Sequence, residues 1–183
     1  MKKKVDFPVS NARRYLEPGP IVLVSSAHRG ATNIMTVGWH TIMEFTPSLL
    51  GCVIAGGNHS FAMIRGSGEC VVNLPTLDMT HTVVGVGNTS GADIDKFAHF
   101  GLTAAPAERV SAPIVAECHA HFECRLYDDA LVDPYNFFIL EIVAARVATR
   151  PKHPRTLHYT GEGVFMVAGE VISRRRGFLP GRL

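Results

Sequence analysis

Residues 33–61 combine the chemical groups that could hold a phosphorylated aromatic heterocycle. Asn33 supplies an amide, Thr36 supplies a hydroxyl, and Trp39 is the only tryptophan of the chain. Ser60 ends the turn-rich segment 56–60 and suits the start of a helix, where backbone N–H groups can donate hydrogen bonds to an anion. An aromatic ring could pack beside Trp39. The same residues also fit a core tryptophan, a polar turn and an ordinary helix cap, and composition alone favours this second interpretation.

A second group of reactive side chains lies at 118–124, where two thiols and two imidazoles occur within seven residues. They are Cys118, His119, His121 and Cys124. Both residue types are zinc ligands. Alternation along one strand directs the thiols to one face and the imidazoles to the other, so they cannot converge on one ion. We therefore predict no metal site, and the cysteines, which lack CxxC spacing, are expected to be reduced core thiols.

Motifs for other chemistries are absent from the sequence. Gly85, Gly87 and Gly91 miss the dinucleotide-binding spacing GxGxxG by one residue and follow a predicted helix instead of a strand. The chain contains neither a Walker A sequence nor the GxSxG of a hydrolase nucleophile elbow. Nothing in these patterns points to phosphoryl transfer or to a serine hydrolase.

The elements that must position these groups are mainly strands. Apolar, β-branched runs bounded by turn residues predict strands over 21–26, 33–43, 49–54, 69–74, 114–127, 137–148 and 164–172. Short helices are expected within 60–64, 76–84 and 94–100, the first capped by Ser60 and the last by Asp93, while 153–163 is expected to loop. Without a repeated strand–helix–strand rhythm, this order favours a closed or nearly closed antiparallel barrel over a doubly wound sheet.

Composition limits the classes of protein to consider. The 183 residues, 46% of them hydrophobic, predict one domain over 1–183 with a sizeable core. Basic residues gather in expected solvated tails at 1–4 and 174–183, while 5–173 carry a net charge of −5, which argues against a nucleic-acid partner. The charge-free stretch 45–64 is interrupted by Pro47 and the turn at 56–60, so no membrane span is predicted. The charged N-terminus lacks a secretory apolar run, and we expect a cytoplasmic protein.

Eight segments, taken in order, resemble the flavin-reductase-like, FMN-binding split-barrel family, and especially its flavoredoxin branch. They are Pro-Gly-Pro-Ile-Val-Leu-Val at 18–24, Asn-Ile-Met-Thr-Val-Gly-Trp at 33–39, His-Ser-Phe-Ala-Met-Ile at 59–64, Val-Val-Asn-Leu-Pro at 71–75, Ser-Gly at 90–91 with Asp-Lys-Phe at 95–97, Gly-Leu-Thr at 101–103, Ala-Pro at 112–113 and Phe-Glu-Cys-Arg at 122–125. The resemblance covers about residues 15–172. It implies a mainly β protein, an antiparallel split β-barrel of the Greek-key, FMN-binding type with a few short helices.

The resemblance also implies FMN at the interface of a homodimer. The cofactor-binding positions that it implies are Asn33, Met35, Thr36, Trp39, His59, Ser60 and Lys96. The first three would line the isoalloxazine and ribityl region, and the tryptophan would pack near the ring. The last three would surround the phosphate, where an ammonium group and a helix start together neutralise a dianion.

One segment departs from the family pattern. Members commonly carry Gly-Asp-His before the strand that begins here at 137, whereas this chain reads Asp133-Pro134-Tyr135. Tyr135 therefore replaces an imidazole near the flavin region and is the one candidate for a catalytic position. Because tyrosine titrates near pH 10 and histidine near 6.5 in model peptides, tyrosine is a poorer proton relay at neutral pH.

Together these features predict an FMN-dependent, flavin-reductase-like oxidoreductase. It would accept electrons from NAD(P)H or a protein donor and pass them to free flavin or another acceptor, with the cofactor carrying the redox chemistry. Two alternatives stay open. One is a flavoredoxin-like FMN electron carrier with little NAD(P)H turnover, and the other is a cofactor-free split barrel that acts as a structural dimer.

Overall fold

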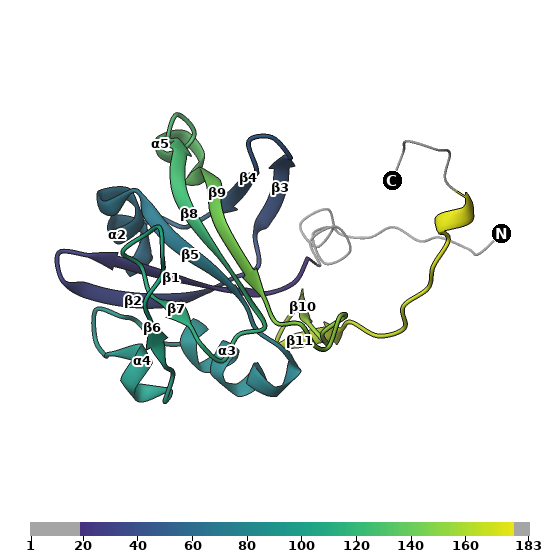
Figure 1. Cartoon of the computed structure of the whole chain (residues 1–183). Coiled ribbons are helices and arrows are strands. Elements are labelled where there is room, and N and C mark those ends of the chain that lie inside the picture. The colour runs from purple at the N-terminus through teal and green to yellow at the C-terminus, as the bar shows by residue number, and fades with distance from the viewer. Residues whose placement is uncertain (1–18, 178–183) are drawn as a thin grey trace, which may run out of the picture.

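A large antiparallel sheet dominates the computed structural model, which describes residues 19–177 (Figure 1). Its strands are β1 (Val22–His28), β2 (Ala31–Val37), β3 (His40–Glu44), β4 (Leu49–Val53), β5 (Glu69–Leu74), β8 (Ala120–Asp128) and β9 (Phe137–Val147). They lie in the order β2-β1-β5-β8-β9-β4-β3, so β2 and β3 form the two edges. Only Gly38 and Trp39 separate these edge strands along the chain, and the sheet therefore curls into a barrel that is split between them.

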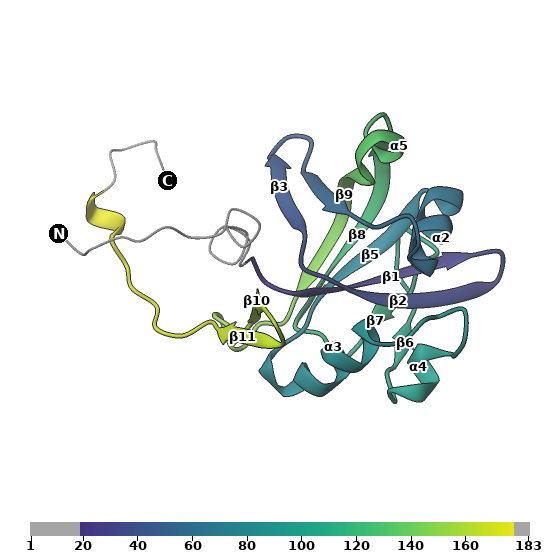
Figure 2. The ribbon, with the colours of Figure 1, turned by 180° about the vertical axis from the view of Figure 1, so that it is seen from behind.

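Short helices and two ribbons complete the fold. The helices are α2 (His59–Ser67), α3 (Thr80–Gly87), α4 (Lys96–His99) and α5 (Val132–Tyr135), with 3-10 turns η2 (Leu77–Met79) and η3 (Arg175–Gly177). The ribbons pair β6 (Ala104–Ala105) with β7 (Ile114–Val115), and β10 (Leu157–Gly161) with β11 (Val164–Val167). Seen from behind, α2 lies on one side of the β1–β2 hairpin, and α3 and α4 lie on the other (Figure 2). None of the helices within 19–177 has the length and apolar character needed to cross a membrane.

Two apolar clusters form on the two faces of this hairpin, because side chains alternate along a strand. Val24 and Met35 point into the barrel, where they join Phe138 and Leu140. Leu23 and Ile34 point the other way, and they pack against Val83 and Val86 of α3 and Phe97 of α4. The hairpin is thus buried on both faces, and residues that follow one another in β2 serve different sides of the molecule.

Several predicted boundaries are wrong, and the tertiary structure explains why. The strand expected over 33–43 breaks at Gly38 because the chain crosses there from one sheet edge to the other. The strand expected over 114–127 divides into β7 and β8, and the loop expected over 153–163 contains β10. The last strand ends at Val167 instead of 172. The tail at 1–4 and residues 178–183 of the C-terminal tail lie outside the described residues.

Both predicted helix caps are displaced by two residues. Asn58, and not Ser60, caps α2, since the Asn58 Oδ1 accepts a hydrogen bond from the Ser60 backbone N–H at 3.0 Å. Asp95, and not Asp93, caps α4 through the Ala98 N–H at 3.1 Å. Asn and Asp are strong caps, and in each case the better placed neighbour takes the role.

Strict alternation also fails along β8. A bulge lies between Glu123 and Cys124, and Glu123 is buried, where it accepts backbone hydrogen bonds from Glu108 and Arg109. Cys118 precedes the strand and contacts the Met79 sulfur at 3.9 Å, whereas Cys124 lies in the barrel core. The two thiols therefore do not share a face. Among the described residues, no three His, Cys, Asp or Glu side chains are arranged to hold a metal ion.

Candidate functional site

The free edge of β2 carries three of the predicted site residues, Asn33, Met35 and Thr36. Within residues 19–177 no strand pairs with its outer edge, so the edge is open between α2 on one face and α3 on the other. Asn33 and Met35 belong to the α2 side, while Thr36 belongs to the α3 side. A flat ligand lying along this edge would meet polar groups from both faces and from the backbone between them.

Asn33 and Ser60 form the polar contact on the α2 side. The Asn33 Nδ2 donates a hydrogen bond to the Ser60 Oγ at 2.8 Å, and both residues are buried. The Asn33 Oδ1 is also shielded from solvent but has no hydrogen-bond partner among the described residues. A buried acceptor left unpaired costs about 1–3 kcal/mol, so this oxygen is suited to a donor supplied by a ligand.

Gly91 closes over the same amide. A Cβ atom at this position would lie 2.0 Å from the Asn33 Oδ1, closer than any real contact of that kind. Only glycine therefore lets the loop between α3 and α4 approach Asn33. The loop and the unpaired oxygen form a cradle at the β2 edge that a side chain on residue 91 would fill.

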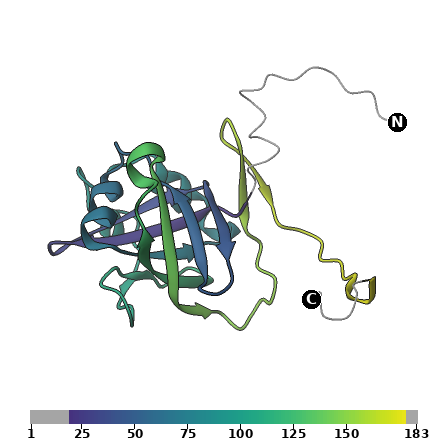
Figure 3. The same ribbon diagram turned by 90° about the horizontal axis from the view of Figure 1, so that it is seen from above.

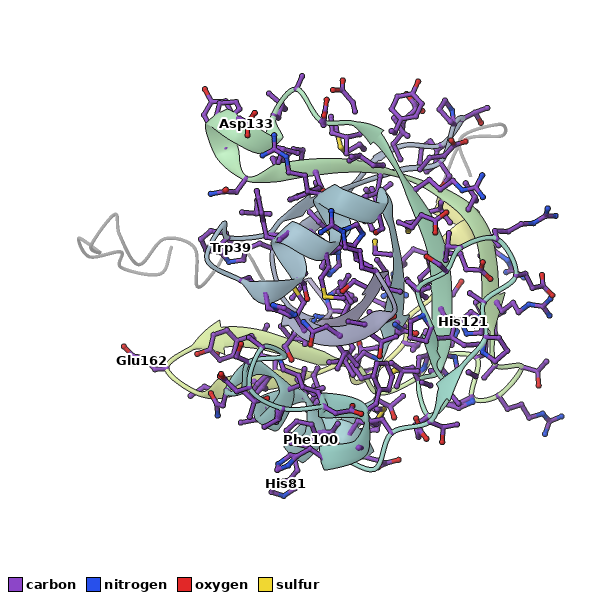
Figure 4. The ribbon with its side chains drawn as sticks, turned by 90° about the vertical axis from the view of Figure 1, so that its left-hand side faces the viewer. Trp39, His81, Phe100, His121, Asp133 and Glu162 are labelled. Atoms are coloured by element: carbon purple, nitrogen blue, oxygen red, sulfur yellow. The ribbon has the colours of Figure 1, made fainter. Side chains whose placement is uncertain are left out.

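A cavity of about 730 Å³ opens on the α3 side of the edge. Thr36 and Trp39 line it from the sheet, Gly87 and Asn88 from the end of α3, and Tyr159 from the β10–β11 hairpin. Thr36 Oγ1 donates to the Val83 carbonyl at 2.7 Å, and Trp39 is 52% exposed. In Figure 4, Trp39 lies between α5, marked by Asp133, and the hairpin tip, marked by Glu162. The volume lies in the range of sites for cofactors and substrates.

Lys96 is a buried cation at the start of α4. Its Nζ donates to the Val86 carbonyl at 2.9 Å, and burial lowers the pKa of this ammonium group. No carboxylate pairs with Lys96 within residues 19–177, so an anionic ligand would complement it. Lys96 contacts α3, whereas Ser60 contacts Asn33 on the α2 side, and the structure does not bring these two predicted phosphate ligands into contact.

Two other predicted ligands contribute little through their side chains. The Met35 side chain lies in the barrel core, so only its backbone reaches the edge of β2. His59 is the exposed first residue of α2 and stands next to Ser60. The predicted set thus divides into an Asn33–Ser60 pair, a cavity lined by Thr36 and Trp39, and a separate buried Lys96.

Tyr135 lies on α5 and is 69% exposed. Arg65 of α2 holds α5 by two hydrogen bonds to Asp133, at 2.5 and 3.1 Å, and this contact lowers the pKa of the Asp133 carboxyl. The Ile54 N–H donates to the Asn136 carbonyl at 3.0 Å, which joins α5 to the segment before α2. Tyr135 is therefore near the α2 end of the site and does not line the cavity beside Trp39.

The β10–β11 hairpin forms one wall of the cavity, and the sequence did not predict it. Tyr159 and Phe165 pack with ring centroids 5.1 Å apart, and the Gly163 N–H donates to the Tyr159 hydroxyl at 3.0 Å. Leu157 and Tyr159 alternate before Gly161, and Phe165 and Val167 alternate after Gly163. That alternation around two glycines was the available signal for a hairpin.

Comparison with known proteins identifies the family. Residues 13–167 match the model of the flavin reductase like domain, and the chain belongs to this family. An uncharacterized protein of Archaeoglobus fulgidus is 32% identical over 135 residues, which cover 74% of this chain and 76% of the relative.

Solved structures agree on the fold. The FMN-binding domain of a flavin reductases-like enzyme from Shewanella baltica is 29% identical, with a TM-score of 0.79 over 91% of this chain and 95% of that one. The flavoredoxin of Desulfovibrio vulgaris (Miyazaki F), 24% identical, superimposes with a TM-score of 0.82 over 96% of this chain and 97% of its own. At that identity the likeness shows the fold alone. The predicted split-barrel architecture is confirmed.

Proposed function

We propose that this chain binds FMN along the free edge of β2 and acts as an FMN-dependent oxidoreductase. The observation that carries the proposal is the buried Asn33 Oδ1, which lacks a partner among the described residues and lies under Gly91 at an open sheet edge. A ribityl hydroxyl is a donor of the kind this oxygen needs. Membership of the flavin reductase like family and the FMN-binding neighbour from Shewanella baltica support the same ligand.

The chain's own groups would divide the work of binding. Asn33 would accept from the ribityl chain, the backbone of Met35 would face the ring, and Trp39 would cover part of it from the cavity side. Lys96 would offer its ammonium group to the phosphate, since an anion offsets the cost of burying that charge. FMN, when bound, supplies the redox chemistry, and no side chain is required as a nucleophile.

The electron donor and acceptor form the finer part of the proposal. We infer that NAD(P)H or a protein donor reduces the protein, and that free flavin or another small molecule or protein accepts the electrons. We further infer a homodimer and a cytoplasmic location. The cavity beside Trp39 is large enough for a second planar ring.

An FMN electron carrier with little NAD(P)H turnover is the second candidate, and the position of Tyr135 favours it. By the family resemblance, this residue stands where members commonly carry histidine. Its side chain is exposed and lies outside the cavity beside Trp39. A protein without a proton relay at this place would still hold FMN and exchange electrons with a partner.

Anaerobic stopped-flow mixing of the FMN-loaded protein with NADH or NADPH tests the choice. Reduction is observed as loss of the visible absorbance of the flavin. Reduction by either nucleotide on a catalytic time scale supports the oxidoreductase. Reduction by dithionite but by neither nucleotide contradicts NAD(P)H as the electron donor and favours the carrier.

A further inference from the structure

An apolar groove of about 390 Å³ leads into the interior of the split barrel. Val22, Val72 and Phe122 line it from the neighbouring strands β1, β5 and β8. Ile42 and Ile142 line it from β3 and β9. Figure 3, seen from above, shows β9 running across β1, so the strands that line the groove belong to different walls of the barrel. Val22 and Val72 are also part of the barrel core, and the groove therefore opens onto that core.

The described residues leave this groove partly uncovered. Ile42 is 61% exposed, and Leu74, Phe122 and Ile142 are only partly buried although they pack against the barrel core. Among residues 19–177, His40 is the only titratable residue that lines the groove. An opening of this kind exposes apolar surface to water unless another segment covers it. The groove thus suits an apolar occupant and not a charged one.

The chain enters the described structure at the groove itself. Gly19 and Pro20, the first two described residues, both line it. The His40 Nε2 lies 2.7 Å from the Pro20 carbonyl oxygen, within hydrogen-bonding distance, and this contact fixes the entry point to β3. The segment that precedes Gly19 therefore starts from a wall of the groove.

The sequence of that segment carries an apolar face. Ala12, Tyr15 and Leu16 have the i, i+3, i+4 spacing of one side of a helix. Arg13 and Arg14 fall outside this set. One side of the segment can therefore be buried while its charged groups stay in water.

The connection is short enough to place Leu16 at the groove. Leu16 precedes Gly19 by three residues, and three residues span at most about 11 Å in any conformation. Glycine also adopts backbone angles that other residues avoid, which lets the chain turn back toward the barrel. Because Gly19 lines the groove, Leu16 stays within about 11 Å of its wall at any protein concentration.

We propose that residues 12–16 pack onto the apolar groove of their own chain, with the Leu16 side chain inside the groove and Ala12 and Tyr15 at its rim. The segment closes this end of the barrel and keeps water from the core. The tether through Gly19 favours the segment of the same chain over that of a second copy, which would have to be recruited from solution. None of the proposed FMN ligands lines the groove, so this packing is independent of flavin chemistry.

Urea unfolding of the full chain tests whether Leu16 is buried. Leu16→Asp should raise the equilibrium constant for unfolding about tenfold or more, because the groove loses its apolar occupant. Val9→Asp is the matched control, since it makes the same kind of change in the same segment but outside residues 12–16. It should leave the constant within about twofold of wild type. Equal effects of the two substitutions would overturn the proposal.

Disulfide trapping in the full chain shows which chain fills the groove. Leu16→Cys and Ile42→Cys are combined in one chain and oxidised briefly with diamide, and mass spectrometry should find positions 16 and 42 linked within single chains. Leu16→Cys with Tyr127→Cys is the control pair. Tyr127 is 55% exposed but lies five residues beyond Phe122 on β8, about 17 Å along the strand, and no link is expected.

The native thiols should not obscure this result. Burial raises the pKa of Cys52 and of Cys118 to about 12, so these groups react slowly. Links formed only between copies would place the segment on a second molecule, and the absence of any link would leave the groove without it. Either result would refute the proposal. Titration of the chain carrying both Leu16→Cys and Ile42→Cys with FMN, which should match wild type, reports separately on flavin binding.

Discussion

Asn33 illustrates what single residues contribute to this protein. The nitrogen of its side-chain amide donates a hydrogen bond to Ser60. The oxygen, beside Gly91, has no hydrogen-bond partner among the described residues. The residue type was a visible signal in the sequence, and so was Ser60. Their contact was not, because it joins positions 27 residues apart whose distance depends on how α2 packs on β2.

Replacing Asn33 by leucine tests its role in flavin binding. Leucine has a similar size but offers no acceptor, so affinity should fall about threefold to tenfold, as expected for one neutral hydrogen bond. FMN and riboflavin should lose affinity equally because both carry the ribityl chain. Isothermal titration with both ligands measures this, and unchanged affinities would remove Asn33 from the site.

Lys96→Met tests whether Lys96 binds the phosphate group of FMN and not the rest of the ligand. Loss of a charge-assisted contact of about 1.5–3 kcal/mol should weaken FMN about tenfold to a hundredfold, while riboflavin should change little. Equal losses for the two flavins, measured by the same titrations, would show that Lys96 only supports the end of α3.

The pH dependence of stability gives an independent check on Lys96. Burial lowers its pKa, so between that lowered value and the unfolded value near 10.5 the unfolded chain binds more protons. The flavin-free wild type should therefore gain stability as pH rises through this interval, and Lys96→Met should lose that part of the gain. Urea unfolding at several alkaline pH values measures the difference.

At the scale of elements, the loop between α3 and α4 depends on a close approach to β2. Gly91→Ala would place a methyl group 2.0 Å from the Asn33 Oδ1, so the loop must move away and open the cradle. We expect lower FMN affinity, by about tenfold or more, and a fall in unfolding free energy of about 1–3 kcal/mol. Gly57→Ala is the control, because nothing lies within 4 Å of its added Cβ. Equal behaviour of the two variants in titration and thermal unfolding would contradict the cradle.

Helix α5 carries the departure at Tyr135. If an imidazole at this place assists proton transfer, Tyr135→His should raise acceptor turnover about tenfold or more, the lower range for a positioned acid or base. Affinity for FMN should stay within a few-fold, since the side chain is exposed and away from Lys96. The gain should vary between about pH 5.5 and 7.5, where histidine titrates. Steady-state rates that match wild type across this range would show that the substitution has no catalytic meaning.

The sequence predicted most elements but not their limits. β-branched runs identified β1, β4, β5 and β9, because their apolar residues and flanking turns are local features. The break at Gly38, the bulge at Glu123 and the position of β10 depend on contacts with distant strands, which local patterns do not contain. The same limit applies to the caps of α2 and α4, where two candidates that lie two residues apart compete for each cap.

On the scale of the whole molecule, the curl of the sheet forms the candidate site. The edges β2 and β3 are joined by two residues, so the barrel stays split there and leaves β2 open to a ligand beside α2, α3 and the β10–β11 hairpin. The order of segments predicted this fold through the family resemblance, and the comparisons confirm it. The sequence could not predict that Lys96 and Ser60 lie apart. Their positions depend on which face of the β1–β2 hairpin each helix covers.

Binding of FMN by the wild-type chain is the most direct test of the account. Purified protein is stripped of flavin, titrated with FMN, and separated from free ligand by ultrafiltration so that the bound flavin can be counted. Binding should saturate at one FMN per chain, with the flavin absorbance altered by its protein surroundings. Protein that retains its fold by circular dichroism yet shows no saturable FMN binding would contradict it.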